Sequence, residues 1–179
     1  MSSWMVTAVL LVGLASACSP HRESADTSPT SATTVQPQSI EVPLYEQFES
    51  ANAEGANGTP IDARLVGKSY PLSTGMWVGC RGTAATATYR LDRTFTRLTA
   101  TVGLQEQAPD GLAVRVTISG DGQVLSEFTV RKTATMSVDL KVDSTDSLVV
   151  AAILEQGICG QADVPYGALG DAVLTTNRD

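Results

Sequence analysis

The chain has 179 residues, of which 42% are hydrophobic and 17% charged, a composition that suits one globular domain with a sizeable core. Its formal net charge is −7, and from Leu44 to the C-terminus there are 11 Lys and Arg against 16 Asp and Glu. Because binding to phosphate groups requires a basic face, this excess of acid argues against nucleic acid and anionic lipid headgroups as partners.

Residues 1–17, MSSWMVTAVLLVGLASA, contain no charged side chain, and their apolar stretch Met5–Leu14 is too short to span a bilayer. We expect this segment to be an export signal. Its end, Leu14–Cys18, resembles the lipobox of bacterial lipoprotein signals, which implies cleavage before Cys18 and attachment of a lipid such as palmitate to the thiol. The mature protein would then be extracytoplasmic and anchored to the cell membrane. The alternative is an ordinary secretory signal cleaved after Ala17, which gives a secreted protein with an odd free thiol.

The next segment, residues 18–43, is rich in Ser, Thr, Pro and Gln and has almost no large apolar residue before Ile40. Such a composition buries too little surface to offset the entropy of ordering the chain. We therefore expect a disordered tether between the lipid anchor and a domain at residues 44–179.

Within that domain the dominant period is two. Apolar and polar residues alternate in Leu98–Leu104, Val114–Ile118 and Val138–Val142, which is typical of strands with one face in water. Leu148–Leu154 is continuously apolar and predicts a central strand covered on both faces. Ser119–Gly122 has the Gly and Asp residues of a tight hairpin turn. These patterns predict an all-β protein, an antiparallel β-sandwich or jelly roll.

Two cysteines, Cys80 and Cys159, lie in the domain, each at the end of a strand-like run. In an exported protein an even pair favours a structural disulfide. A catalytic thiol would need a base such as histidine, and the sole histidine, His21, precedes the domain. The same absence removes Ser-His-Asp triads and most zinc sites, so we expect no catalytic residue and no metal site. Hydrolysis by a pair of carboxylates is the enzymatic alternative that stays open.

Several short motifs follow one another in a fixed order along the domain. They are Val66–Ser73, Ala87–Leu91, Phe95–Leu104, Val114–Ile118, Gly120–Leu125 and Gly170–Leu174. Their order resembles that of the NPCBM/NEW2 family, a module associated with family 98 glycoside hydrolases. The resemblance implies a galactose-binding-like jelly roll and non-catalytic recognition of carbohydrate. Members often carry a tryptophan where this chain has Leu169-Gly170-Asp171, so an envelope protein-interaction or structural module without a sugar site is the alternative.

A sugar site in water usually needs an exposed aromatic ring with polar groups beside it. Trp77 and Tyr166 both lie in segments that Gly and Pro mark as loops, and a disulfide would bring these loops to one end of the domain. They are the candidate ligand-binding aromatics. The candidate polar groups near them are Arg81, Gln161 and Asp163. In the alternative interpretation, Trp77 packs over the disulfide and touches no ligand.

No cofactor is required by any motif. Calcium is the one ion for which the sequence offers possible ligands, because Asp143 and Asp146 place two carboxylates in one turn. The turn lacks the further oxygen ligands of a calcium-binding loop, which favours a bend exposed to solvent. The expected partners are thus a glycan or an envelope protein, together with the membrane through Cys18.

Overall fold

A computed structural model of the chain describes residues 39–53 and 55–176. The predicted export signal, the lipid site at Cys18 and most of the predicted tether lie outside the described residues. The described part consists almost entirely of β-strands in two antiparallel sheets, with one short 3-10 helix, η1 (Leu44–Gln47). None of its helices is long and apolar enough to cross a membrane.

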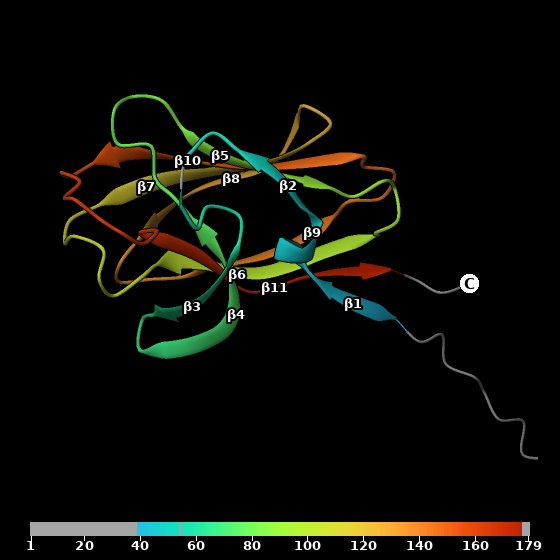
Figure 1. The fold of residues 1–179 in the computed structure, drawn as a ribbon, viewed down its shortest axis with the longest axis horizontal. Helices are drawn as coiled ribbons and strands as arrows, with labels where there is room; N and C mark the ends of the chain where they lie inside the picture. The colour runs from blue at the N-terminus through green and yellow to red at the C-terminus, as the bar shows by residue number, and fades with distance from the viewer. Residues whose placement is uncertain (1–38, 54, 177–179) are drawn as a thin grey trace, which may run out of the picture. The chain divides into compact units, whose positions relative to one another are not determined.

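The two sheets form the two layers of a sandwich (Figure 1). The first sheet contains β1 (Ile40–Pro43), β3 (Pro60–Leu65), β4 (Lys68–Met76), β6 (Arg97–Leu104), β9 (Met136–Lys141) and β11 (Gly167–Thr176). The second contains β2 (Phe48–Ala51), β5 (Ala85–Arg90), β7 (Ala113–Gly120), β8 (Gln123–Arg131) and β10 (Ser147–Gln156). The strand orders are β3-β4-β11-β6-β9, with β1 added to β11, and β2-β5-β10-β7-β8. The predicted all-β sandwich is confirmed.

The core lies between the sheets and follows the period of two. In β6 the side chains of Leu98, Ala100 and Val102 are buried, and those of the intervening residues face outward. The apolar run at residues 148–154 forms β10, which pairs with β5 on one side and β7 on the other, as a central strand should. Its inward residues Leu148, Val150 and Ala152 are buried, whereas the outward residues between them are half-buried, so the outer face is covered only in part.

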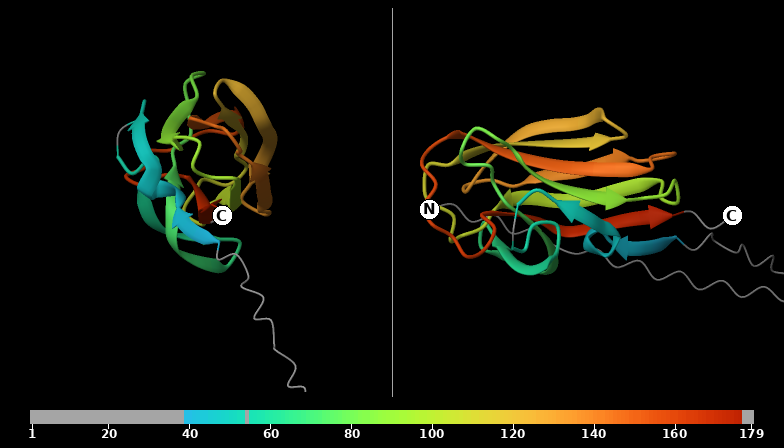
Figure 2. Two further views of the ribbon diagram at one scale, coloured as in Figure 1. Left: turned by 90° about the vertical axis from the view of Figure 1, so that its right-hand side faces the viewer. Right: turned by 45° about the horizontal axis from the view of Figure 1, so that its top comes forward.

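The hairpin predicted at residues 119–122 joins β7 to β8, with positive φ angles at Asp121 and Gly122. The start of the sheet differs from expectation. β1 pairs with the end of β11 from Ile40 onward, so the last four residues of the expected tether belong to the first sheet (Figure 2). The physical reason is that β4 pairs only with the start of β11, at residues 167–169. The backbone N–H and C=O groups on the same side of residues 173–176 need partners, and β1 supplies them.

Candidate functional site

The segment GMWVGC, Gly75–Cys80, carries the chain from the first sheet to the second. Met76 ends β4, and three residues later the N–H of Gly79 donates to the carbonyl oxygen of Ala152 in β10 at 3.0 Å. The N–H of Leu154 donates back to the oxygen of Gly79 at 3.1 Å. Met76 and Val78 are buried in the core, whereas Trp77 between them is half-buried and lies outside the core cluster.

Both glycines of this segment are required by close backbone contacts. A Cβ atom on Gly79 would lie 1.8 Å from the carbonyl oxygen of Thr83, and one on Gly75 would lie 2.1 Å from that of Ala56. Neither distance is compatible with a side chain. The backbone on either side of Trp77 is therefore fixed in place, although the glycines of the sequence suggest only a loop.

The predicted disulfide between Cys80 and Cys159 is confirmed, with a Cα–Cα distance of 6.1 Å. It joins the segment that follows β4 to the segment that follows β10, and so links chain from the two sheets. Both sulfur atoms are in the bond, so neither is a free nucleophile.

A hollow of about 500 Å³ lies beside this bond, and we call it the disulfide hollow. Its lining consists of Trp77, Cys80, Arg81, Leu154, Gly157, Ile158, Cys159, Gly160, Gln161 and Tyr166. Four of the five candidate residues from the sequence therefore meet at one surface. The fifth, Asp163, is exposed in the same loop and does not line the hollow.

Trp77 is held through its backbone, and one edge of its ring packs near Gly55. Its N–H donates to Oδ1 of Asn57 at 3.0 Å, and Asn57, only 3% exposed, donates through Nδ2 to the oxygen of Thr86 at 2.9 Å. The indole Nε1 lies next to Gly55, 3.2 Å from where a Cβ atom on that residue would be, and it is buried without a hydrogen-bond partner within residues 39–53 and 55–176. The nitrogen edge of the ring is thus turned toward Gly55, and Trp77 also lines the disulfide hollow.

Tyr166 has a different role from the one its loop position suggests. It is only 4% exposed, and its hydroxyl donates to the carbonyl oxygen of Gly160 at 2.7 Å. Its ring therefore lies beneath the hollow and offers no exposed face on which a sugar could stack. The hydroxyl fixes the loop that carries Cys159 and Gln161.

Sequence reasoning missed the buried polar side chains that hold these loops. Gln105 is buried, and its Nε2 donates to the carbonyl oxygen of Pro165 at 2.6 Å, next to Tyr166. Asn57 holds Trp77 by accepting a hydrogen bond from its backbone N–H. Ile158, which is 85% exposed, also lines the hollow and was not identified. Its position next to Cys159 was the only signal in the sequence.

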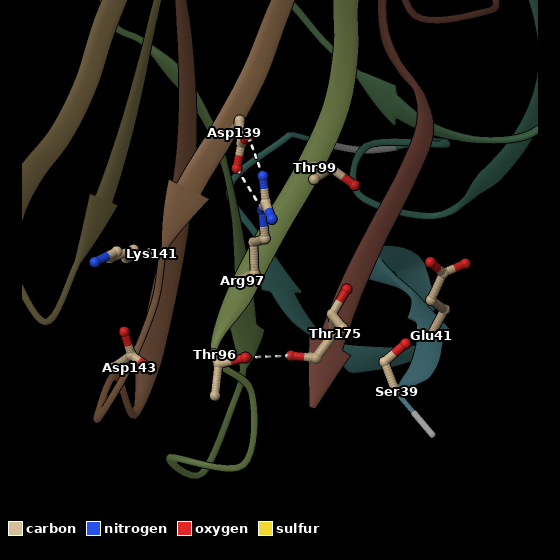
Figure 3. A pocket seen from close by; sticks show the side chains of 9 residues that line it. All are labelled: Ser39, Glu41, Thr96, Arg97, Thr99, Asp139, Lys141, Asp143 and Thr175. Carbon is tan, nitrogen blue, oxygen red and sulfur yellow. Dashed lines mark hydrogen bonds and ion pairs between the residues drawn. The ribbon is translucent and has the colours of Figure 1, made fainter. Parts of the chain in front are cut away.

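A second hollow, of about 810 Å³, lies on the outer face of the first sheet, and we call it the sheet-face hollow (Figure 3). Its lining is Ser39, Glu41, Thr96, Arg97, Thr99, Asp139, Lys141, Asp143 and Thr175, without any aromatic residue. Nε of Arg97 donates to Oδ1 of Asp139 at 2.6 Å, and a second contact joins Nη2 to Oδ2. The hydrogen-bonded Arg97 guanidinium lowers the pKa of Asp139 below its ordinary value.

In the turn that carries Asp143 and Asp146, the candidate calcium ligands, the carboxylate of Asp146 is bound to an arginine. Oδ2 of Asp146 accepts a hydrogen bond from Arg93 at 2.6 Å. In the part of the chain that the structure describes, no group of three or more His, Cys, Asp and Glu residues could hold a metal ion.

The two antiparallel sheets and the loops gathered at the disulfide define a β-sandwich module of the jelly-roll class. Residues 26–174 match the family model of the NPCBM/NEW2 domain, and the chain belongs to this family. The order of motifs in the sequence predicted this membership. No curated protein sequence matches the chain significantly.

Solved structures have the same fold. The chain is similar to CBM51 from Clostridium perfringens GH95 in complex with methyl-galactose, with 18% identity and a TM-score of 0.56 over 75% of this chain and 99% of that chain. It is also similar to CBM51-2, in complex with GlcNAc, and INT domains from Clostridium perfringens ZmpB, with 12% identity and a TM-score of 0.58 over 77% of this chain and 32% of that chain. At these identities the likeness shows the fold alone.

Proposed function

We propose that the chain is a non-catalytic glycan-binding module and that its ligand site is the disulfide hollow. The observation that carries this proposal is the meeting of Trp77, Arg81 and Gln161 around one concave surface. An indole ring covers the apolar face of a pyranose, and guanidinium and amide groups bond to its hydroxyls. Family membership and the sugars bound in two similar structures, methyl-galactose and GlcNAc, support a sugar ligand.

The disulfide hollow is also held in a fixed shape before any ligand arrives. The Cys80–Cys159 bond, the Gly79 backbone pairing and the Tyr166 hydroxyl each fix one of the loops that form it. A site that is already ordered loses less conformational entropy on binding, which favours affinity for a small ligand.

A binding role without catalysis is supported by the chemistry of both hollows. No histidine occurs after His21, and no acidic residue occurs among the described residues that line the disulfide hollow. The sheet-face hollow contains carboxylates, but Arg97 lowers the pKa of Asp139. A glycosidase acid needs a raised pKa to keep its proton near neutral pH.

We further propose that the module is displayed outside the cytoplasm on a lipid at Cys18, with secretion as the alternative. The lipobox-like sequence Leu14–Cys18 supports this location. Growth of the producing cells with a clickable palmitate analogue should label the protein, and Cys18→Ser should abolish the label. Absence of label on the natural protein, or equal label on the variant, would contradict the anchor.

A glycan array tests the binding role. The protein should bind a defined set of glycans, and Trp77→Ala should reduce binding roughly 2- to 12-fold, because an aromatic contact contributes on the order of 0.5–1.5 kcal/mol to such a site. Lys141→Gln is the matched control, because it changes a residue of the sheet-face hollow and should leave binding unchanged. If no glycan binds, the sugar proposal is wrong; if Trp77→Ala binds normally, the site is elsewhere.

Interaction with an envelope protein is the second candidate. It is favoured by two exposed apolar side chains in the loop between β10 and β11, which carries Cys159. They are Ile158 at 85% and Val164 at 47% exposure. A stable complex with an envelope protein that Ile158→Ser disrupts and Trp77→Ala does not would support this candidate over the glycan site.

A further inference from the structure

We infer that the disulfide hollow selects glycans that carry an anionic group, a carboxylate or a sulfate, and that Arg81 is its counter-ion. This inference rests on the proposed function and names the ligand class of the same site. It follows from the distribution of cations and acids over the described part of the domain.

Arg81 is unusual among the cationic side chains because it has no polar partner. The described residues include ten Lys and Arg. Seven of them form ion pairs with carboxylates: Arg64, Lys68, Arg90, Arg93, Arg97, Arg115 and Lys132. Arg131 donates a hydrogen bond to Gln156 at 3.1 Å. Among the Lys and Arg residues within 39–53 and 55–176, only Arg81 and Lys141 have a side chain without a hydrogen bond or an ion pair.

The surroundings of these two free cations differ. Lys141 lines the sheet-face hollow together with the carboxylates of Glu41, Asp139 and Asp143. An anion that approached Lys141 would therefore be repelled by nearby acids. The described lining of the disulfide hollow contains Arg81 and no acid, and Asp163 lies outside that lining. Arg81 thus creates a locally positive site on a domain that is acidic overall.

An anionic ligand would gain a charge-assisted hydrogen bond to Arg81 without displacing an internal partner. The guanidinium is planar and can bond to two oxygens of one carboxylate or sulfate group, which neutral hydroxyls match less well. Trp77 and the apolar side chain of Ile158 line the same hollow and offer contact to the sugar ring. The combination fits a pyranose that carries its negative charge on a substituent, as in a uronic acid or a sulfated hexose.

Calorimetric titration of the protein with three matched sugars tests this inference. The sugars are methyl galactoside, methyl galacturonide and methyl galactoside 6-sulfate, which differ only at C6. At low salt at least one of the two anionic sugars should bind roughly 5–10 times more tightly than the neutral one. The two anionic sugars distinguish carboxylate from sulfate. The preference should shrink as the salt concentration rises, because the hollow is open to solvent.

Arg81→Gln keeps hydrogen-bonding capacity and removes the charge, so it should bring the ratio of anionic to neutral affinity to about one. Lys141→Gln removes the same charge outside the disulfide hollow and should leave the ratio unchanged. Equal binding of all three sugars to the natural protein, or an unchanged ratio in Arg81→Gln, would overturn the inference while the glycan site remains. Absence of binding by any sugar or array glycan would overturn both.

Discussion

The disulfide hollow and the sheet-face hollow lie on the same module, but they are built by different means. The sheet-face hollow is formed by side chains on paired strands, where the β6–β9 register places Thr99 opposite Asp139 and lets Arg97 reach that carboxylate diagonally. Its principal charges therefore bind each other. The disulfide hollow is formed by loops that a covalent bond and backbone contacts hold, so Arg81 is left without a partner.

The difference indicates where ligand recognition is to be expected on this fold. A strand surface satisfies its own polar groups through cross-strand pairs and gains little from a ligand. Loops that are held in place through their backbone keep their side chains free to bind a ligand. The same difference predicts that changes to the bonds and backbone contacts that hold the disulfide hollow lower stability, that changes to its Trp77 and Arg81 side chains alter binding, and that changes at the sheet-face hollow alter neither strongly.

The largest expected effect is on stability. Cys80→Ser combined with Cys159→Ser opens a link between residues 79 positions apart. In the chain-entropy model this lowers the free energy of unfolding by about 4–5 kcal/mol and the Tm by roughly 10–20 °C. Chemical denaturation and calorimetry measure both quantities. A loss below about 1 kcal/mol would show that the backbone contacts alone hold the hollow.

A smaller loss of folding stability is expected from Gly79→Ala. The new Cβ would meet the Thr83 carbonyl oxygen at 1.8 Å, so the crossing segment must move, at a cost of about 1–3 kcal/mol or more. Gly160→Ala, in the segment on the other side of the disulfide, is the matched control, because a Cβ there would make only ordinary contacts, the nearest with the Tyr166 hydroxyl at 3.5 Å. Equal stability of the two variants by urea denaturation would contradict the tight approach at Gly79.

Tyr166→Phe removes one hydrogen bond, from the hydroxyl to the Gly160 carbonyl oxygen, and keeps the buried ring. The expected loss of stability is about 0.5–1.5 kcal/mol. Hydrogen exchange of the loop amides at residues 157–161 should become faster, while that of β6 should not change. Unchanged exchange in the loop would show that Tyr166 is not what fixes it.

The smallest effect is predicted in the sheet-face hollow. Arg97→Gln should leave the Tm nearly unchanged, because the ion pair with Asp139 is exposed to solvent. The pKa of Asp139 should rise toward its ordinary value. Since the folded-state pKa is lowered in the natural protein, the pair stabilises above the ordinary Asp pKa and loses its effect as pH falls through the lowered value. NMR titration of Asp139 in both proteins measures the shift, and identical values would contradict the pairing.

The sequence predicted the sandwich from its period of two, and the disulfide from its even pair of cysteines. That disulfide in turn predicted the meeting of Trp77, Arg81 and Gln161, but Asp163, predicted beside them, does not line the hollow. It could not predict the burial of Tyr166, since the partner of the hydroxyl, the Gly160 oxygen, is defined only by the folded loop. It could not show that Arg81 is free either. That property depends on which carboxylates the folded sheets bring to the other cations.

Fluorescence of Trp77 during titration with a glycan identified on the array is the most direct test of the disulfide hollow as the ligand site. In a Trp4→Phe background Trp77 is the only tryptophan. Its emission should change with the glycan and saturate at the concentration at which calorimetry shows saturation. Saturable binding by calorimetry with unchanged Trp77 emission, and with normal affinity in Trp77→Ala, would place the site elsewhere on the module.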